Sequence, residues 1–339
     1  MTPSRAGAWA FKRMLFHGGL LSLARLARQR GRGLVLRYHA ITDGPADVAY
    51  ATPEICLAVR AFRLQMAFVK RAYRPIPLDE LVAATANGGA LPPRAVAITF
   101  DDGYADNHRL AMPVLKQLGL PATVYVATGT LEDGPPLWMS SVRALVFGAT
   151  CAELHVPGFD PLALGPIAGR GAVARRLTRL LVPLTDGERA ERIAAAAATA
   201  QVDLAHALRG VMLTWAQVRD MADAGWTIGA HTVTHVNVAL SAPAVAEAEI
   251  AASRDAIAAV VRAPVTHFAY PNAGGEHRYF SNEVVEILRR LGFRSGVTSQ
   301  PGALRPKADP FLLPRVGVSP RLAPVIELAA ALERQRLAA

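Results

Sequence analysis

The stretch AVAITFDDGY, residues 95–104, decides the fold of this chain. Its beginning, Ala95 to Ile98, is short, apolar and partly β-branched, which predicts a buried strand. Asp101 and Asp102 follow at the carboxyl end of that strand, directly before a glycine. On its own an Asp-Asp-Gly triplet is typical of a turn, because Asp accepts local backbone hydrogen bonds and Gly tolerates positive φ. The rest of the chain must therefore say whether this pair of like charges has a chemical role.

Strand-like and helix-like segments alternate on both sides of this stretch. Strands are predicted at residues 33–38, 95–100, 122–127, 226–230, 265–270, 293–297 and 312–318. Helical patterns lie between them, most clearly at residues 61–73, 106–118, 215–224, 242–261 and 282–291. Such alternation favours parallel strands covered by helices. A closed or nearly closed β/α barrel is the simplest such arrangement, and an open doubly wound sheet is the alternative.

The predicted organisation has four parts. Residues 131–209 break the alternation and read as a partly helical insertion after the third strand. In a barrel such an insertion lies among the loops that frame the active face. Residues 1–32 form a basic amphipathic N-terminal segment, residues 33–320 the barrel with its insertion, and residues 321–339 a C-terminal helix.

Composition restricts the class of protein. The 339 residues are 52% hydrophobic, enough for a large core in one α/β domain with an insertion or in two domains. The formal net charge of +10 suggests anionic partners, but only four of the 37 basic residues are lysines and the arginines are spread along the chain. Because no basic block with interleaved aromatic residues occurs, we expect no nucleic-acid partner.

The N-terminal segment raises the question of a membrane. Residues 11–30 resemble a basic amphipathic helix that could make peripheral contact with an anionic membrane, although packing against the domain is the commoner fate. The segment is too short and too charged for a transmembrane helix and lacks the cleavage site of a signal peptide. We therefore expect a cytoplasmic or inner-membrane-associated protein. Cys56 and Cys151 match no metal-ligand spacing and are expected to be thiols rather than a disulfide.

Polar, titratable residues gather where the predicted strands end. Besides the two aspartates, the fourth strand ends in GAHTVTH, which carries His231 and His235, and the first strand ends in RYH with His39. In parallel β/α folds the carboxyl ends of the strands meet on one face. Two histidines and a carboxylate on that face would make a metal site with open coordination positions.

These motifs together resemble a known family. TFDDGY (99–104), HTVTH (231–235) and FAYPN (268–272), with LRYHAI (36–41) before them and LPRVGV (313–318) after them, are similar to the polysaccharide deacetylase family, the NodB-homology carbohydrate esterases. The resemblance covers residues 33–318 apart from the insertion. It implies an α/β fold, a distorted (β/α)7 barrel, which agrees with the seven strands counted above.

The resemblance also implies roles for individual residues. Asp101 would be the general base, and Asp102, His231 and His235 would bind one divalent metal ion, zinc first, with cobalt or nickel as other candidates. The backbone N–H of Asn272 would stabilise the oxyanion. With the metal assisting hydrolysis of the amide, one carboxylate is held by the ion while its neighbour stays free to accept a proton.

The chain departs from the family pattern at two points. Family members often carry an arginine in the third motif and a histidine near the C-terminus, and both are missing here. His39 is the expected replacement as general acid, because the first and last strands of a barrel are neighbours and an ordinary histidine pKa near 6.5 suits the task. His267 is the second candidate. Arg315 is the expected partner of Asp101, because a buried guanidinium needs a carboxylate.

The sequence thus predicts a hydrolase that acts on carbon–nitrogen bonds other than peptide bonds. Its substrate would be the N-acetyl group of amino-sugar residues in a polysaccharide, an oligosaccharide or a glycoconjugate. A related amidase or O-acetyl esterase is an alternative, because the same metal and base would serve either bond. An inactive glycan-binding or assembly subunit is another, motivated by the two missing residues.

Overall fold

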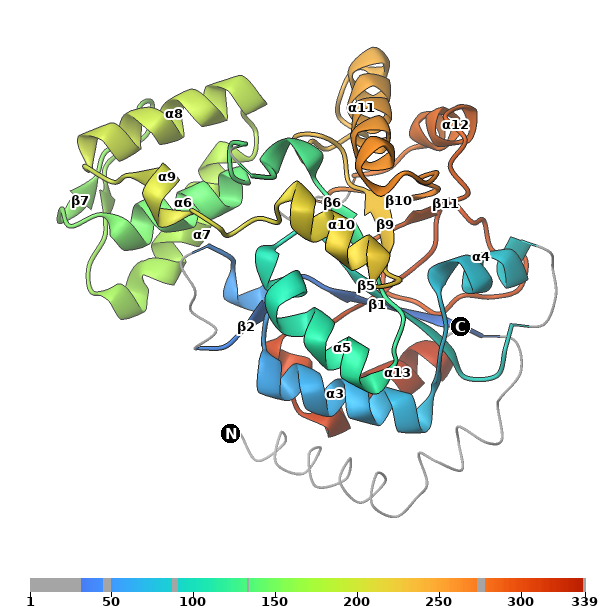
Figure 1. Ribbon diagram of the computed structural model, residues 1–339. Coiled ribbons are helices and arrows are strands. Elements are labelled where there is room, and N and C mark those ends of the chain that lie inside the picture. Colours follow the sequence, from blue (N-terminus) through green and yellow to red (C-terminus); the bar gives the residue numbers. More distant parts are fainter. Residues whose placement is uncertain (1–31, 45–49, 87–90, 133, 273–277, 338–339) are drawn as a thin grey trace.

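The barrel is built from seven parallel strands, in the order β11-β10-β9-β6-β5-β1-β12 (Figure 1). The computed structural model describes residues 32–44, 50–86, 91–132, 134–272 and 278–337. The strands are β1 (Leu34–Tyr38), β5 (Ala95–Phe100), β6 (Thr123–Val126), β9 (Thr227–Ala230), β10 (His267–Ala269), β11 (Ser295–Val297) and β12 (Val316–Gly317). Each of the seven predicted strands is therefore present.

The two ends of this strand order meet. β12 pairs with β1, with Leu36 opposite Val316, and Leu313 just before β12 forms a parallel bridge to Val297 of β11. β12 is shorter than the predicted strand because Pro314 cannot donate to a ladder. The bridge brings the edge strands together, so the nearly closed β/α barrel is confirmed over the open sheet.

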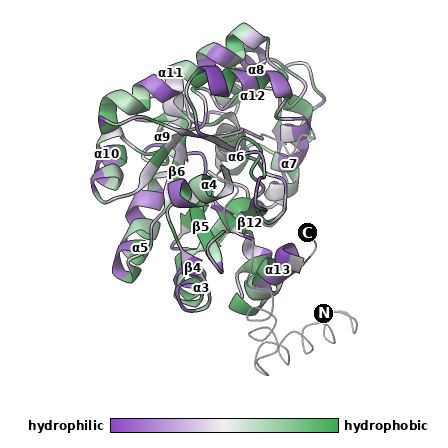
Figure 2. Ribbon diagram, turned by 90° about the vertical axis from the view of Figure 1, so that its right-hand side faces the viewer, coloured by the Kyte–Doolittle hydropathy of each residue, from purple (hydrophilic) through white to green (hydrophobic). Residues whose placement is uncertain are grey.

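Helices cover the outside of the barrel (Figure 2). The helices that follow the strands in the chain coincide with the predicted ones to within a few residues. They are α3 (Val59–Ala72), α5 (Met112–Leu118), α10 (Trp215–Asp223), α11 (Pro243–Val261), α12 (Asn282–Arg290) and, from the C-terminal segment, α13 (Val325–Leu337). Another helix, α4 (Leu78–Ala86), closes the amino end of the barrel, where Leu81 packs with Val35, Ala97 and Tyr125. Side chains thus fill that end and leave the carboxyl ends of the strands open for a site.

The helix predicted at 106–118 is regular only in its second half. Asn107–Ala111 form a π-helical turn, and α5 begins at Met112. Pro113 lacks the N–H that an α-helix continuing through this point would use. The side chains of the turn reach back to the first strand instead: Asp106 accepts from the N–H of Ile41 at 2.9 Å, and Asn107 donates to the carbonyl of His39 at 2.7 Å. The turn therefore fixes the segment that carries His39.

The inserted segment forms a lobe with its own hydrophobic cluster (Figure 1). The buried members of this cluster include Leu145, Leu154, Leu177 and Ile193. Its elements are α6 (Trp138–Gly148), β7 (Glu153–Leu154), β8 (Leu162–Ala163), α7 (Arg170–Leu181), α8 (Asp186–Thr199) and α9 (Leu204–Ala207). The expected partly helical insertion is thus mostly helix, with one short antiparallel pair of strands.

Short elements complete the described chain. β2 (Ala40–Thr42) pairs with β3 (Cys56–Ala58), and β4 (Arg74–Pro75) adds to the start of β5. Cys56 and Cys151 form no disulfide, as expected. Residues 1–31 lie outside the described residues, and with them the segment 11–30 considered for membrane contact. No helix in the described part of the chain is long and apolar enough to cross a bilayer.

Candidate active site

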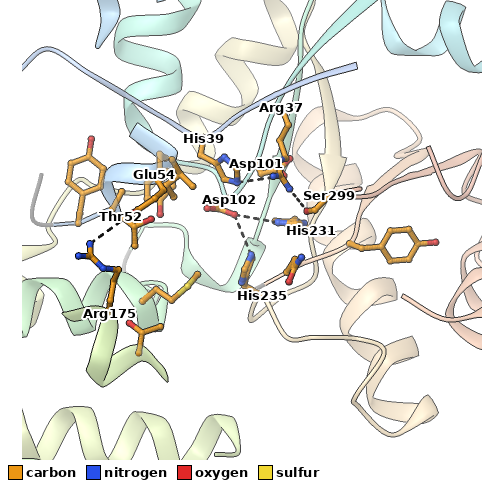
Figure 3. A pocket seen from close by; sticks show the side chains of 18 residues that line it. Arg37, His39, Thr52, Glu54, Asp101, Asp102, Arg175, His231, His235 and Ser299 are labelled. Atoms are coloured by element: carbon orange, nitrogen blue, oxygen red, sulfur yellow. Dashed lines mark hydrogen bonds and ion pairs between the residues drawn. The ribbon is translucent and has the colours of Figure 1, made fainter. Parts of the chain in front are cut away.

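A cavity of about 440 Å³ lies at the carboxyl ends of the strands (Figure 3). Barrel strands, the loops that follow them and the inserted lobe all contribute to its wall. Six of the residues singled out from the sequence line it: His39, Asp101, Asp102, His231, His235 and Asn272. The seventh, Arg315, lies behind Asp101 and is only 1% exposed.

The turn after β5 separates the two aspartates. Asp101 continues the strand, and its N–H donates to the carbonyl of Tyr38 at 3.0 Å. Asp102 has a φ of 77° and Gly103 a φ of 88°, so the chain reverses within two residues. A Cβ on Gly103 would lie 2.7 Å from Val126 Cγ1, which explains why only glycine fits there. The left-handed conformation is strained for a residue other than glycine, such as Asp102, and strained residues of this kind are common at functional sites.

Asp101 forms a two-point ion pair with Arg315. Nη1 and Nη2 of the arginine lie 2.6 Å and 2.7 Å from Oδ1 and Oδ2 of the carboxylate. The guanidinium is held in turn by the carbonyl of Thr298, at 2.8 Å from Nε, and by the hydroxyl of Thr99, at 3.2 Å from Nη1. Burial by itself would raise the pKa of Asp101, but the charge and hydrogen bonds of Arg315 outweigh it and bring that pKa to about 2. Asp101 is therefore a carboxylate at every physiological pH.

Asp102 points the other way, toward two histidines. Its Oδ1 lies 3.4 Å from Nε2 of His231 and 3.3 Å from Nε2 of His235. One ligand atom from each of the three residues lies within 4.8 Å of the others, and all three residues are buried. Burial raises the pKa of Asp102, yet the hydrogen bonds from both histidines lower it well below the ordinary value.

This arrangement fits a divalent cation. Nδ1 of His231 lies 2.7 Å from the carbonyl oxygen of Ala269 and donates its proton there, so Nε2 is the ring nitrogen left to bind a cation. Two imidazoles with one carboxylate are also the donor set that suits zinc and related transition metals.

A glutamate that the sequence analysis gives no role fixes the histidine loop. Glu249 of α11 accepts hydrogen bonds from the N–H groups of Val233 and Thr234, both at 2.9 Å, and from the Thr234 hydroxyl at 3.0 Å. Thr232 and His235 both have left-handed φ, of 64° and 61°. A lone glutamate on a helix carries no signal in the sequence, since its partners come from a loop 15 residues earlier.

His39 lies beside Asp101, with Nε2 at 3.9 Å from Oδ2 of the carboxylate. Nδ1 of His39 is buried and has no hydrogen-bond partner among the described residues. The prediction that His39 keeps an ordinary pKa near 6.5 is wrong, because burial lowers the pKa to about 4 against the opposing charges of Asp102 and Asp101. His39 is therefore neutral at pH 7.

His267 lies at the other end of the barrel. Its imidazole contacts Ser295 Oγ at 2.7 Å and Asp79 of α4 at 3.0 Å, and it does not line the cavity. The second candidate for the general acid therefore does not line the cavity that Asp101 lines.

Asn272 lines the cavity at the end of the described segment after β10. Neither its backbone N–H nor its buried side-chain oxygen has a hydrogen-bond partner among the described residues. The residue expected to stabilise an oxyanion thus lies at the wall of the cavity.

The inserted lobe supplies part of the cavity wall. Met139 of α6 and Arg175 and Thr178 of α7 line it. Arg175 lies 3.7 Å from Glu54, which belongs to the loop between β2 and β3 (Figure 3). The weak periodicity of the insertion gave no indication of which of its residues would face the site.

Comparisons with known proteins agree with this geometry. The family model described as polysaccharide deacetylase matches residues 88–148 and 186–296, about half of the chain. YxkH of Bacillus subtilis (strain 168) is 22% identical over 287 residues, which cover 84% of this chain and 71% of YxkH. The solved structure of the Streptococcus pyogenes deacetylase PplD, in complex with acetate, is 20% identical with a TM-score of 0.58, covering 90% of this chain and 97% of PplD.

A shorter match links the chain to an enzyme with a named polymer. The poly-beta-1,6-N-acetyl-D-glucosamine N-deacetylase of Escherichia coli (strain K12) is 29% identical over 103 residues. That match covers 30% of this chain and only 15% of the Escherichia coli protein.

Proposed function

Because the chain belongs to the polysaccharide deacetylase family, whose members are hydrolases acting on carbon–nitrogen bonds other than peptide bonds, we propose that it removes N-acetyl groups from amino-sugar residues of a glycan with the help of one divalent metal ion. The observation that carries the proposal is the separation of two adjacent carboxylates. Asp101 is paired with Arg315, while Asp102 faces His231 and His235 across the same cavity. One carboxylate is thus available as a base and the other as a ligand.

Asp102, His231 and His235 would hold the metal. Zinc is the first candidate and cobalt or nickel the next, by the chemistry of two imidazoles and a carboxylate. When bound, a divalent ion supplies a Lewis acid that polarises the acetyl carbonyl and lowers the pKa of water. The remaining steps belong to side chains and backbone groups of the chain itself.

Asp101 accepts the proton of the attacking water. Its pKa of about 2 keeps it ionised, and the two-point pair with Arg315 keeps the carboxylate in one orientation. The same low pKa makes protonated Asp101 a strong acid, so it gives the proton up readily to a more basic neighbour.

His39 is that neighbour and passes the proton to the leaving amine. Its Nε2 is 3.9 Å from Asp101, and its pKa of about 4 lies above that of Asp101 and far below that of an amine. In this scheme the proton passes from water to Asp101, then to neutral His39, then to the amine nitrogen. These proton transfers return Asp101 to the carboxylate and His39 to the neutral imidazole. They do not require a histidine that solvent has already protonated.

The backbone N–H of Asn272 donates to the oxyanion that forms as the carbonyl carbon becomes tetrahedral. A donor aimed at this oxygen typically contributes about 10² to 10³ in turnover. The proposal gives Asn272 that role because the residue lines the cavity and its N–H makes no hydrogen bond with a described residue.

The substrate proposed is a polymer, oligomer or conjugate of N-acetylated amino sugars. The family match and the Escherichia coli relative's name support it. An O-acetyl ester would need the same base and metal but no proton on its leaving group, so a preference for esters would indicate the related esterase. An inactive binding subunit is disfavoured because Asp101 is paired with Arg315, and Asp102, His231 and His235 converge, as the proposed chemistry would need.

Acetate release from a panel of N-acetylated glycans tests the proposal. We expect zinc-loaded protein to release acetate and chelator-treated protein to release none until metal is returned. Asp101→Asn should abolish most turnover and retain bound metal, whereas His231→Ala and His235→Ala should lose the metal. Undiminished metal in both histidine variants would refute the ligand assignment, and no acetate from any glycan would refute the function.

A further inference from the structure

A second arginine, Arg37 of β1, lines the cavity and is not used by the steps above (Figure 3). Nη1 of Arg37 donates to the hydroxyl of Ser299, and its buried Nε has no hydrogen-bond partner among the described residues. No described carboxylate forms an ion pair with it, since Asp101 is taken at both oxygens by Arg315. The hydrogen-bonding capacity of this guanidinium is therefore mostly unused by the protein.

The strands are built to admit this side chain. Arg37 lies opposite Gly317 in the pairing of β1 with β12. A Cβ on residue 317 would lie 2.9 Å from Nη2 of Arg37, closer than real contacts allow. The position of the guanidinium thus depends on a glycine in the neighbouring strand.

Of the three arginines at the cavity, Arg37 is the one without a carboxylate in contact among the described residues. Burial and the charge of Arg315 lower the pKa of Arg37, but an arginine begins so far above neutrality that it stays a cation. On the opposite wall Arg175 is matched by Glu54. Asp101 is matched by Arg315, and Asp102 faces two histidines. A guanidinium whose buried Nε has no hydrogen-bond partner among the described residues favours an anion from the ligand as its partner.

We propose that Arg37 and Ser299 bind an anionic group, a carboxylate or a phosphate, carried by the glycan. The planar fork of a guanidinium suits either anion, and the hydroxyl adds one donor. The inference rests on the proposed function for the identity of the glycan, and it adds that the preferred amino-sugar substrate carries negative charge.

The kinetic test compares three oligomers of equal length: a neutral N-acetylglucosamine oligomer, one with carboxylate substituents and one with phosphate substituents. In Arg37→Gln we expect kcat/KM to fall about 10- to 100-fold on the anionic oligomer that the site recognises and about twofold or less on the neutral one. Whichever anionic oligomer Arg37→Gln hydrolyses more slowly shows whether the site binds a carboxylate or a phosphate. Gly317→Ala should act in the same direction, because it displaces the guanidinium without changing charge. Arg63→Gln, on the exposed surface of α3, is the control for loss of one positive charge.

Two results would overturn the inference. Equal losses on all three oligomers would place Arg37 in the machinery shared by every substrate, and a wild-type enzyme that hydrolyses the neutral oligomer best would remove the need for an anion.

A binding measurement keeps the inference separate from the proposed function. Calorimetric titration of the metal-loaded protein with glucuronate, glucose 6-phosphate and glucose reports the anion site without turnover. Binding of either anionic sugar that is lost in Arg37→Gln, with an unchanged melting temperature, would support the site even if no glycan released acetate. Identical titrations for wild type and Arg37→Gln would refute it even if deacetylation were established.

Discussion

At the scale of single residues, Arg315 determines how acidic Asp101 is. The ordinary pKa of an aspartate is near 3.8, and burial alone would move it upward, yet that of Asp101 is about 2. A carboxyl whose folded pKa is depressed stabilises the fold above the unfolded pKa, and this contribution is lost as the pH falls from 3.8 to about 2. The arginine therefore acts on both the stability and the basicity of the site.

Replacement of Arg315 by glutamine should change the pKa of Asp101 from below its ordinary value to above it. Without the cation burial dominates, the pKa of Asp101 rises above 3.8, and the acid limb of kcat/KM moves to higher pH. The pH profile of kcat/KM between about pH 4 and 8 measures the position of this acid limb. Arg315→Lys is the comparison variant, because lysine keeps the positive charge and loses the two-point hydrogen bonding of the guanidinium. We also expect a loss of about 3–5 kcal/mol in the free energy of unfolding, because a buried carboxylate loses its partner. An acid limb that stays in place would contradict the assignment of Asp101 as the base.

His39 gives a second prediction at this scale. If it carries the proton to the leaving amine, His39→Ala should lower amide turnover by about 10² to 10⁴ without loss of metal. An activated aryl acetate has a leaving group that needs no proton, so its hydrolysis should fall much less. Equal losses on the amide and the activated ester would indicate damage to the structure, and full activity on the amide would exclude His39 from the mechanism.

At the scale of elements, a helix fixes the loop that carries His231 and His235. Glu249 of α11 receives three hydrogen bonds from Val233 and Thr234, between the two histidines. The loop also contains two left-handed residues, Thr232 and His235, whose conformations cost free energy unless the surroundings hold them. The ligand geometry therefore depends on how α11 packs beside β9.

Glu249→Gln should weaken the metal site although Glu249 is not a ligand. The amide of glutamine has one oxygen and can accept fewer hydrogen bonds from the loop than the carboxylate of Glu249. Residues that hydrogen-bond around metal ligands typically contribute about 10- to 100-fold to metal affinity. Zinc affinity measured by competition with a chelator checks this. Glu247→Gln is the matched control, since Glu247 lies on the same helix and pairs with Arg290 on the surface. Equal zinc affinities in the two variants would show that α11 does not support the loop.

At the scale of the whole molecule, the inserted lobe and the barrel together form the cavity. Thr178 of α7 lines it, and its hydroxyl donates to the carbonyl of Ala174 one turn earlier in the same helix. Access to the metal site is thus shaped by a segment with a separate hydrophobic cluster. This arrangement allows the cavity wall to be altered without changing the barrel.

A bulky residue at Thr178 should select against large substrates. We expect Thr178→Trp to lower kcat/KM on glycan oligomers about tenfold or more and to leave a small aryl acetate nearly unaffected, with little change in melting temperature. Thr199→Trp is the matched control, because Thr199 makes the same bond one turn back in an exposed part of α8. Unchanged oligomer kinetics in Thr178→Trp would mean that substrates do not approach the site past α7.

The sequence by itself determined the strands, most helices and the polar residues at the strand ends. These features depend on local patterns: apolar runs before Asp101 and His231, helical periodicity between them, and the spacing of two histidines in HTVTH. The sequence favoured a closed or nearly closed barrel over an open sheet, and the bridge between Leu313 and Val297 decided between the two. The roles of Asp101, Asp102 and the histidines remain predictions until the variants are measured.

Only the tertiary structure decided the properties that arise between distant segments. The two-point pair of Arg315 with Asp101 joins residues 214 positions apart, and the low pKa of His39 comes from burial that no local pattern reports. Glu249 and Thr178 belong to no motif, and LRYHAI gives no indication that Arg37 lines the cavity, because the neighbours of all three are set by which strand and helix lie beside them. Short-range spacing in the sequence determines which side chains stand at the strand ends. The orientation of those side chains, the balance of their charges and their desolvation depend on how the barrel closes and on where the lobe packs against it.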